Sequence, residues 1–371
     1  MIKSRQIKKP CIRRYTHPLP DLDKRFFLNI DIYFFSGWHV TMDTKIFYEA
    51  DTNIELLNDR TIAIVGYGAQ GRAHAQNIRD SGCKVVVGQR PGGQGHSDAL
   101  ADGFEPIAIS EATSQADIIN VLLPDEVHGE VFKESIEPNL NPGDIVMTCH
   151  GFSFHYSLIQ KEGDFDRLLV APKGQGHMVR GEYLRGGGVP CLIAVDENSK
   201  PETFQLGLAY AAALGGAKAG ILQTTIAAET ETDLFGEQAV LCGGVTSLVQ
   251  AGFDTLVDAG YQPELAYFEC LHELKIIVDL LHSSGIEKMR HAISNTAEYG
   301  DYVSGDRVID DRVRNNMKQI LTDIQSGKFA DQFLQQHYQG DNELNELRSK
   351  SKGQTIETVG AKLRAMMPWL K

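Results

Sequence analysis

The sequence lacks several features that would place its 371 residues in a common class. It has no run approaching the ~20 consecutive apolar residues that a membrane-spanning helix needs. Its six cysteines include no CxxC pair, so neither a zinc cluster nor a disulfide framework is indicated, and a reducing cytoplasm fits best. It also lacks excess positive charge, since 36 Lys and Arg stand against 49 Asp and Glu. The resulting net charge of −13 argues against a general nucleic-acid-binding surface.

The sequence does contain enough hydrophobic residues to form a folded core. Hydrophobic residues make up 42% of the chain and charged residues 23%. That composition excludes a disordered or collagen-like chain. At roughly 100–200 residues per domain, the length suggests two or three domains.

Residues 1–41 differ in composition from the rest of the chain. They hold eight of the Lys and Arg residues but only three of the acids, with scattered aromatics and no clear helical or strand period. No apolar run follows the basic start, as a signal peptide requires. Ordinary patterning starts at Met42. We therefore expect that translation begins there and that residues 1–41 are an extra segment, untranslated or disordered.

A short apolar run followed by glycines predicts a dinucleotide-binding turn. Residues 61–65 are predicted to form a buried parallel strand and residues 72–79 a helix, with Gly66, Gly68 and Gly71 between them in GxGxxG spacing. The first glycine permits the tight turn, the second lets a pyrophosphate approach the backbone, and the third allows close packing of helix on strand. A glycine turn in an α/β fold without a nucleotide is the alternative.

Further strand-like runs follow along the chain, at residues 84–88, 117–123, 144–148, 168–171 and 191–195. Because they alternate with helical stretches, they predict an α/β Rossmann domain with a doubly wound, mostly parallel sheet over residues 42–224. The loop after residue 88 has no acid, and Arg90 can pair with a phosphate. This loop therefore favours NADP over NAD, with a stacked or solvated Arg90 as the alternative.

After about residue 224 the strand pattern stops, and residues 225–371 are predicted to be helical. The expected helices cover residues 225–260, 263–283, 286–299 and 306–326. Their apolar residues suggest that they are largely buried.

His74, in the predicted helix after the glycine turn, is expected to lie on a helix surface or in a loop.

Two acid pairs lie in the predicted helices at i,i+4 spacing, namely Asp233 with Glu237 and Glu269 with Glu273. At this spacing both carboxylates share one helix face, about 6 Å apart. Acids of like charge on a buried helix repel unless a cation lies between them, and Mg²⁺ prefers oxygen ligands. A solvated face, or pairing with a nearby Lys or Arg, is the alternative.

Together these motifs resemble those of class I ketol-acid reductoisomerase, also named acetohydroxyacid isomeroreductase. The resemblance covers about residues 42–371. It rests on the stretches GYGAQGRAHAQNIRDSG, LLPDEVHGEVF, CHGFSFHY, APKGQGHMVR, ETDLFGEQAVLCGG, ECLHELKIIVDL, ISNTAEYGDY and GAKLRAMMPWL. Several of these are specific to this family and not shared by Rossmann proteins in general.

The resemblance implies a Rossmann domain followed by an all-α, knotted C-terminal domain. It implies conversion of 2-acetolactate, or of 2-aceto-2-hydroxybutyrate, to the 2,3-dihydroxy acid by alkyl migration and reduction with NADPH, in valine, leucine and isoleucine synthesis. It also implies two Mg²⁺ ions and a homodimer or larger homo-oligomer with a shared active site. No nucleic-acid or membrane partner is expected, and the expected location is cytoplasmic.

The resemblance also assigns roles to individual residues. Asp233, Glu237, Glu269 and Glu273 match metal ligands, the second pair coming from the partner subunit. His150 and Lys173 match active-site residues, Ser294 matches a substrate contact, and we add Glu273 as a candidate proton relay. The residues that match cofactor contacts are Gly66, Tyr67, Gly68, Ala69, Gln70, Gly71, Arg90, Asp125, Glu126, Val127, His128 and Gly176.

One departure from the family pattern concerns the cofactor. Relatives that use NADP usually have serines where this chain has Gly93 and Gly95. A hydrogen bond to a charged group contributes ~1.5–3 kcal/mol, so their absence weakens the choice of NADPH and leaves NADH or dual use open.

Two rival functions remain at this point. One is a metal-independent hydroxyacid or 6-phosphogluconate-type dehydrogenase, and the other is a nucleotide-sensing Rossmann protein without catalysis. The dehydrogenase would not need two pairs of acids at i,i+4 spacing. The second would be expected to have lost the acids or Lys173, and all of them are present.

Overall fold

The computed structural model describes residues 31–33, 39–41 and 44–370. The chain divides into two compact units, residues 1–46 and 47–371. In the first unit, strands β1 (Asp31–Tyr33) and β2 (His39–Thr41) pair antiparallel. The prediction that residues 1–41 are an extra segment falls mostly outside the described residues, and these two strands do not test it.

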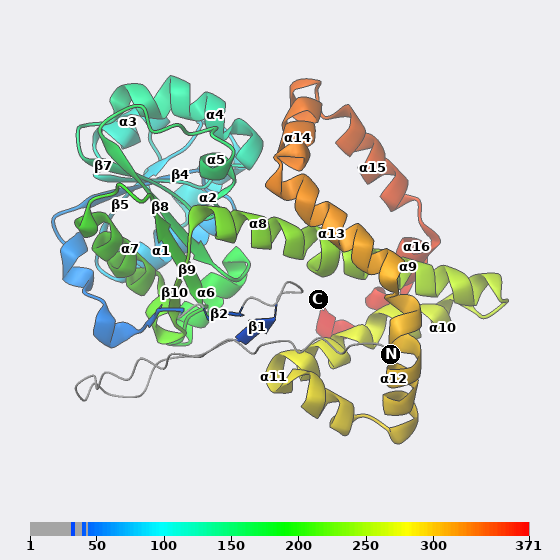
Figure 1. The fold of residues 1–371 in the computed structure, drawn as a ribbon. Helices are drawn as coiled ribbons and strands as arrows, with labels where there is room; N and C mark the ends of the chain where they lie inside the picture. The colour runs from blue at the N-terminus through cyan, green and yellow to red at the C-terminus, as the bar shows by residue number, and fades with distance from the viewer. Residues whose placement is uncertain (1–30, 34–38, 42–43, 371) are drawn as a thin grey trace, which may run out of the picture. The chain divides into compact units, whose positions relative to one another are not determined.

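Seven strands of a mixed sheet lie in the second unit (Figure 1). Their order is β10-β9-β8-β7-β6-β4-β5, and neighbours are parallel except for β8 and β9, which run antiparallel. The strands are β4 (Thr61–Val65), β5 (Lys84–Gly88), β6 (Ile118–Val121), β7 (Asp144–Thr148), β8 (Phe165–Pro172), β9 (Cys191–Val195) and β10 (Ile221–Gln223). The short β3 (Ile46–Phe47) spans the boundary between the units.

The sheet is buried on both faces. All five residues of β4 are buried, and because side chains alternate along a strand they reach two different cores. Ile62 and Ile64 belong to one core, and Ala63 and Val65 to the other. A strand buried on both faces reads in the sequence as a continuous apolar run, which is why these strands could be predicted.

Helices cover both faces of the sheet. Helices α1 (Ala69–Asp80), α6 (Gly176–Leu184) and α7 (Pro201–Leu214) contribute to the first core, and α3 (Ile109–Ser114) and the π-helical turn η4 (Phe132–Ile136) to the second. The predicted doubly wound Rossmann domain with a mostly parallel sheet is confirmed. Other short elements are η1 (Glu49–Asp51), η2 (Ile54–Leu57), α4 (His128–Val131), η5 (Glu137–Asn139), α5 (Phe152–His155) and η6 (Gly216–Lys218).

The predicted strands agree with the sheet to within a few residues. Four of them coincide with β4, β5, β7 and β9, whereas β6 is shorter and β8 longer than predicted. The sequence did not indicate β10, which has only three residues and therefore shows no period.

The expectation that His74 lies on a surface is wrong. The side chain is fully buried, and its Nδ1 lies 2.8 Å from the hydroxyl of Tyr210 on α7. Asn120 of β6 donates to the same hydroxyl at 2.8 Å. The reason is that α1 is covered by both the sheet and α7, so a polar residue on its inner face is enclosed.

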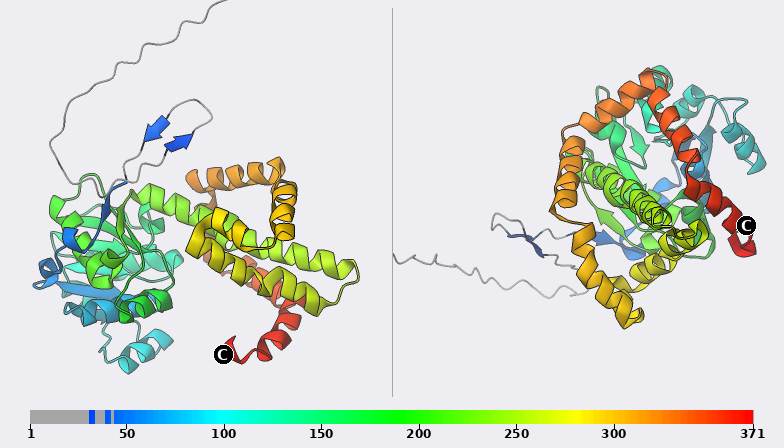
Figure 2. Two further views of the ribbon diagram at one scale, coloured as in Figure 1. Left: turned by 90° about the horizontal axis from the view of Figure 1, so that it is seen from below. Right: turned by 90° about the vertical axis from the view of Figure 1, so that its right-hand side faces the viewer.

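After β10 the described part of the chain contains helices only (Figures 1 and 2). Residues 225–370 are called the helical half below, and residues 47–224 the sheet half. The helical half consists of α8 (Ile226–Gly236), η7 (Glu237–Leu241), α9 (Gly243–Asp258), α10 (Pro263–Tyr267), η8 (Phe268–His272), α11 (Leu274–Ala292), α12 (Asn295–Val308), α13 (Asp311–Gln325), α14 (Lys328–Tyr338), α15 (Asn342–Lys352), α16 (Thr355–Ala365) and η9 (Pro368–Leu370). The all-α class predicted for this half is confirmed, while the knot stays a prediction.

Two of the predicted helices are interrupted by π-helical turns, η7 and η8. In η8 the amide of Glu273 donates to the carbonyl of Phe268, five residues earlier. Such turns are rare in proteins overall, and those that occur are often found at functional sites. Here each of them begins at, or contains, one of the predicted acidic ligands, Glu237 in η7 and Glu269 in η8.

Two other predicted helix ranges, 286–299 and 306–326, are wrong in that each runs across a helix start, whereas the predicted break before residue 286 is confirmed by the non-helical backbone of Gly285 within α11. Ser294 is the N-cap of α12, and its Oγ accepts from the amide of Ala297 at 3.2 Å. Asp310 is the N-cap of α13, and its Oδ1 accepts from the amide of Val313 at 2.9 Å. Short polar side chains satisfy the free amides of a helix start, so the chain begins a new helix at each of them.

The helical half is less buried than predicted. Its largest cluster of buried side chains combines Phe253 of α9, Tyr267 of α10 and Ile356 of α16. Many large apolar side chains remain exposed in this chain, among them Val240, Leu241, Leu248, Leu265, Ile276, Val278, Ile286 and Trp369. The stretch Ile226–Asp258 is long and apolar enough to span a membrane by length and composition alone. It carries Glu229, Asp233 and Glu237, however, which lie in the candidate site.

Candidate active site

The turn after β4 requires glycine at two positions. Gly66 has a φ of +98°, in the left-handed region that favours glycine, and a Cβ there would lie 2.6 Å from the carbonyl oxygen of Leu122. A Cβ at Gly71 would lie 2.1 Å from the carbonyl oxygen of Gly66, so α1 begins tightly against the turn. Gly68 differs, since nothing lies within 4 Å of its Cβ position. The backbone of Gly68 is therefore open to a ligand.

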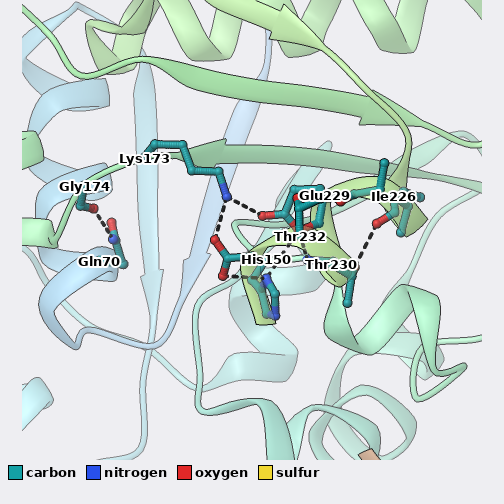
Figure 3. Close-up of polar contacts among 11 residues, drawn as sticks. Gln70, His150, Lys173, Gly174, Ile226, Glu229, Thr230 and Thr232 are labelled. Atoms are coloured by element: carbon teal, nitrogen blue, oxygen red, sulfur yellow. Dashed lines mark hydrogen bonds and ion pairs between the residues drawn. The ribbon is translucent and has the colours of Figure 1, made fainter. Parts of the chain in front are cut away.

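Ala69 and Gln70 begin α1 and join the turn to the loop after β8. Gln70 donates from Nε2 to the carbonyl oxygen of Gly174 at 2.9 Å (Figure 3). Gly176 is also close, because a Cβ there would lie 2.0 Å from the carbonyl oxygen of Ala69. Packing against the turn is thus sufficient reason for a glycine at position 176.

Two predicted cofactor residues point their side chains into the protein. Tyr67 is buried, and its hydroxyl donates to Oδ2 of Asp102 at 2.9 Å. His128 is buried too, with its ring nitrogens 2.8 Å from the carbonyl oxygen of Leu123 and 2.7 Å from Oγ of Ser153. Burial lowers the pKa of His128 and favours the neutral ring. These two side chains hold other protein groups in place.

The remaining predicted cofactor residues lie in two loops that follow β6 and β5. Asp125 begins the 3-10 turn η3 (Asp125–Val127), where burial raises the pKa of its carboxyl. Arg90 is exposed, and Gly93 is the N-cap of α2 (Gln94–Ala101) without a side-chain contact. A Cβ at Gly93 would meet nothing within 4 Å, whereas one at Gly95 would lie 2.6 Å from Nε2 of Gln89.

Four charged side chains meet where β7 and β8 end and α8 begins (Figure 3). Lys173 donates from Nζ to Oε1 of Glu229 and to Oδ1 of Asp233, both at 2.8 Å. Nδ1 of His150 lies 3.3 Å from Oε2 of Glu229 and 3.5 Å from Oδ2 of Asp233. These four residues are named the charged cluster. The structure therefore brings together three predicted site residues, His150, Lys173 and Asp233.

Glu229 is the member of the charged cluster that the sequence analysis missed. Its side chain is 1% exposed, and Oε2 accepts from the amide of Gly151 at 2.9 Å. A signal was present in the sequence, because Glu229, Asp233 and Glu237 continue the same i,i+4 spacing along one helix face. A buried carboxylate with two donors, Gly151 and Lys173, and an ion-pair neighbour, His150, is a strong anchor for its neighbours.

The charges of the cluster balance. Burial alone lowers the pKa of His150, but the carboxylates of Glu229, Asp125 and Asp233 outweigh it and raise the pKa to about 9. Burial opposes the charge of Lys173 in the same way, and the carboxylates of Glu229 and Asp233 raise its pKa on balance. The pKa of Glu229 is lowered, because His150 and Lys173 exceed the effect of burial. Two cations therefore face two carboxylates at neutral pH.

The acids of α8 bear on a metal ion in two ways. His150, Glu229 and Asp233 place ligand-type atoms within 4.8 Å of one another, and Lys173 already donates to both carboxylates of this trio. Burial and the Asp233 carboxylate raise the pKa of Glu237, because like charges repel. A hard divalent cation between Asp233 and Glu237 would relieve that repulsion, so these two acids fit Mg²⁺.

The second acid pair lies apart from the charged cluster in the described contacts. Glu269 and Glu273 are exposed, and no hydrogen bond or ion pair among the described residues joins either of them to His150, Lys173 or Asp233. Ser294 is exposed as well, with its hydroxyl committed to the start of α12. The buried environment expected for the second pair is therefore wrong for a single chain.

Comparison with known proteins identifies the family. Residues 56–220 match the model of the acetohydroxy acid isomeroreductase NADPH-binding domain, and residues 226–369 match that of the ketol-acid reductoisomerase C-terminal domain. The chain belongs to the ketol-acid reductoisomerase family. It is therefore an enzyme of branched-chain amino acid biosynthesis, an oxidoreductase with a nicotinamide-cofactor domain, and neither of the rival functions applies.

Two solved structures illustrate this relationship. An NADH-preferring ketol-acid reductoisomerase from an uncultured archaeon is 42% identical, with a TM-score of 0.84, covering 87% of this chain and 99% of that one. A semialdehyde dehydrogenase NAD-binding protein from Cupriavidus necator is 19% identical, with a TM-score of 0.54, covering 72% of this chain and 99% of that one. The second similarity concerns the fold alone.

Proposed function

We propose that this chain converts 2-acetolactate, or 2-aceto-2-hydroxybutyrate, to the corresponding 2,3-dihydroxy acid. An alkyl group moves to the neighbouring carbon, and the resulting 2-keto acid then takes a hydride from a nicotinamide cofactor. The charged cluster is the observation that carries this proposal. Lys173 lies in the loop that Gln70 joins to the glycine turn, so the cluster is next to the turn that would receive the cofactor pyrophosphate.

Three residues of the charged cluster prepare the site in this proposal. Glu229 is a positioning residue, fixed by the amide of Gly151 and holding Lys173 and His150 in place. Lys173 keeps its proton on Nζ, and His150 keeps one on Nδ1, both beside Asp233. These protons stabilise oxygen atoms on which alkoxide charge develops during the alkyl shift.

The proposed metal ligands are Asp233 and Glu237, together with Glu269 and Glu273. Two Mg²⁺ ions, when bound, supply Lewis-acid stabilisation of alkoxide charge. Glu273 is the proposed proton relay, since it is exposed where η8 meets α11 and the described contacts leave its carboxylate uncommitted. Ser294 is the proposed substrate contact.

A second copy of the chain is proposed to complete the site, in a homodimer or a larger homo-oligomer. Glu269, Glu273 and Ser294 are exposed in the single chain, on helices that also expose apolar side chains such as Ile276 and Val278. Apolar surface of this kind is covered in symmetric oligomers. The same cover accounts for the apolar stretch Ile226–Asp258 without a membrane.

For the cofactor, we propose binding at the glycine turn and the loops after β5, β6 and β8, with NADH accepted as well as NADPH. The contacts proposed are those of the turn Gly66–Gly71, Arg90, the segment Asp125–His128 and Gly176. Arg90 can pair with a 2′-phosphate, but Gly93 and Gly95 offer no hydroxyl to it. The archaeal relative, 42% identical, is NADH-preferring, which supports the use of NADH here.

Two further points of the proposal concern organisation. We place the division between the domains at residues 224 and 225, between β10 and α8. We also propose a cytoplasmic location, which suits the five free cysteines among the described residues.

The test is cofactor oxidation followed by absorbance, with 2-acetolactate and Mg²⁺. NADPH and NADH are compared side by side, with EDTA as the control. We expect turnover that requires Mg²⁺ and a measurable rate with NADH. Well-folded protein with Mg²⁺ but no turnover with either cofactor would contradict the proposal.

A further inference from the structure

Helix α2 is attached to the sheet half by very little apolar surface. It buries one side chain, Ala99, in its eight residues. It directly follows the loop of residues 89–93, the loop in which a Rossmann domain receives the adenosine ribose of its cofactor. Contacts outside the hydrophobic core must therefore fix where this helix and its loop lie.

Both ends of α2 lie close to Tyr67, the residue between the first two glycines of the turn. At the start of α2, the Cβ position of Gly95 is 3.1 Å from the carbonyl oxygen of Tyr67. At its end, Asp102 is the C-cap and accepts the hydrogen bond of the Tyr67 hydroxyl at 2.9 Å. The Tyr67 ring is buried and packs edge-on against Phe104, with 5.8 Å between the centroids.

Two arginines of α1 complete the attachment. Arg72 holds both carboxylate oxygens of Asp102, with Nε 2.6 Å from Oδ2 and Nη2 2.8 Å from Oδ1. Such bidentate pairs fix orientation as well as distance. Arg79 donates to the carbonyl oxygen of Asp102 at 2.8 Å and lies over the ring of Phe104 at 4.5 Å. Tyr67, Arg72 and Asp102 are named the Asp102 clasp.

We propose that Asp102 is a positioning residue for the cofactor. By holding α2 against the glycine turn, the Asp102 clasp fixes the loop of residues 89–93 relative to that turn. The adenosine and pyrophosphate parts of a dinucleotide are thereby received at a fixed separation. This inference rests on the proposed function. It predicts that the clasp controls cofactor affinity and not the chemistry, which takes place at the charged cluster on other elements.

Two variants test the clasp from its two sides. Asp102→Asn removes the charge that faces Arg72, and Tyr67→Phe removes the hydroxyl while keeping the ring. Each is expected to raise the Kd of NADH and NADPH, titrated without substrate or Mg²⁺, by roughly three- to tenfold, the scale of one lost ordinary hydrogen bond. For Asp102→Asn the KM of the cofactor rises in parallel, while kcat at saturating cofactor stays near the wild-type value.

Asp196→Asn is the matched control. Asp196 holds Arg167 of β8 by a bidentate ion pair in the same sheet half, with both N–O distances 2.8 Å, and neither residue is on α1 or α2. The Kd of this variant for either cofactor is expected to equal that of the wild type. Wild-type Kd values for both clasp variants, or an equal rise in Asp196→Asn, would overturn the role of the clasp alone. Wild-type protein that binds neither cofactor would overturn the proposed function together with the clasp.

Discussion

The sheet half and the helical half differ in how much of the candidate site each completes within one chain. In the sheet half, Lys173 and His150 have named partners at measured distances, and the glycine turn is closed by backbone contacts. In the helical half, α8 completes the charged cluster, but Glu269, Glu273 and Ser294 remain exposed. The loops after parallel strands lie at the same edge of a sheet, so their side chains meet within one chain. Side chains on a helix face are enclosed only when another surface packs against that face.

The largest effect is expected where the two halves meet, at Asp233. Asp233→Asn removes the charge that faces Lys173 and the proposed Mg²⁺, so kcat should fall by at least roughly a hundredfold. Steady-state kinetics with 2-acetolactate measures it. The control is Glu231→Gln on the same helix, since Glu231 pairs instead with His155 and Gln325. Near-normal turnover by Asp233→Asn would contradict the assignment.

A second prediction tests whether the core of the sheet half keeps the buried side chain of His74 neutral. Burial lowers the pKa of His74 from 6.5 to about 3, so the unfolded chain binds a proton that the folded chain does not. The free energy of unfolding should therefore fall as the pH drops below 6.5, by up to ~1.4 kcal/mol per pH unit from this group.

Urea titrations between pH 7.5 and pH 5 provide the measurement. The variant His74→Gln, which has no titrating ring, should show a correspondingly flatter pH dependence of its free energy of unfolding. Equal slopes for the variant and the wild type would mean that His74 is not held neutral.

The third prediction, in the helical half, separates a helix cap from a substrate contact. Ser294→Ala and Asp310→Ala each remove one N-cap and should lower the free energy of unfolding by about 1 kcal/mol. Only Ser294→Ala should also weaken the apparent affinity for the acetohydroxy acid substrate, seen as a higher KM in steady-state kinetics, because only Ser294 is proposed to contact it. An equal rise in both variants would assign Ser294 a purely structural role.

The sequence predicted the sheet half well because its signals are local. A strand buried on both faces reads as an apolar run, and the turn at Gly66 needs a backbone that only glycine adopts easily. The burial of His74 was missed because it depends on α7, more than a hundred residues later in the chain.

The helical half was predicted less well because its signals depend on hydrogen-bond geometry and on surroundings. The π-helical turns at Glu237 and Glu269 leave no pattern in residue type. The starts of α12 and α13 were overlooked although Ser294 and Asp310 are favoured N-cap residues. Glu229 could have been predicted, since its spacing from Asp233 equals the spacing of Asp233 from Glu237.

The most direct measurement is subunit complementation between Asp233→Asn and Glu273→Gln chains, each nearly inactive by itself. If each site takes Asp233 from one chain and Glu273 from its partner, half of the sites in a mixed dimer are intact. Random mixing of equal amounts then restores about a quarter of the wild-type activity with 2-acetolactate and Mg²⁺. Activity no greater than the sum of the two variants alone would contradict the shared site.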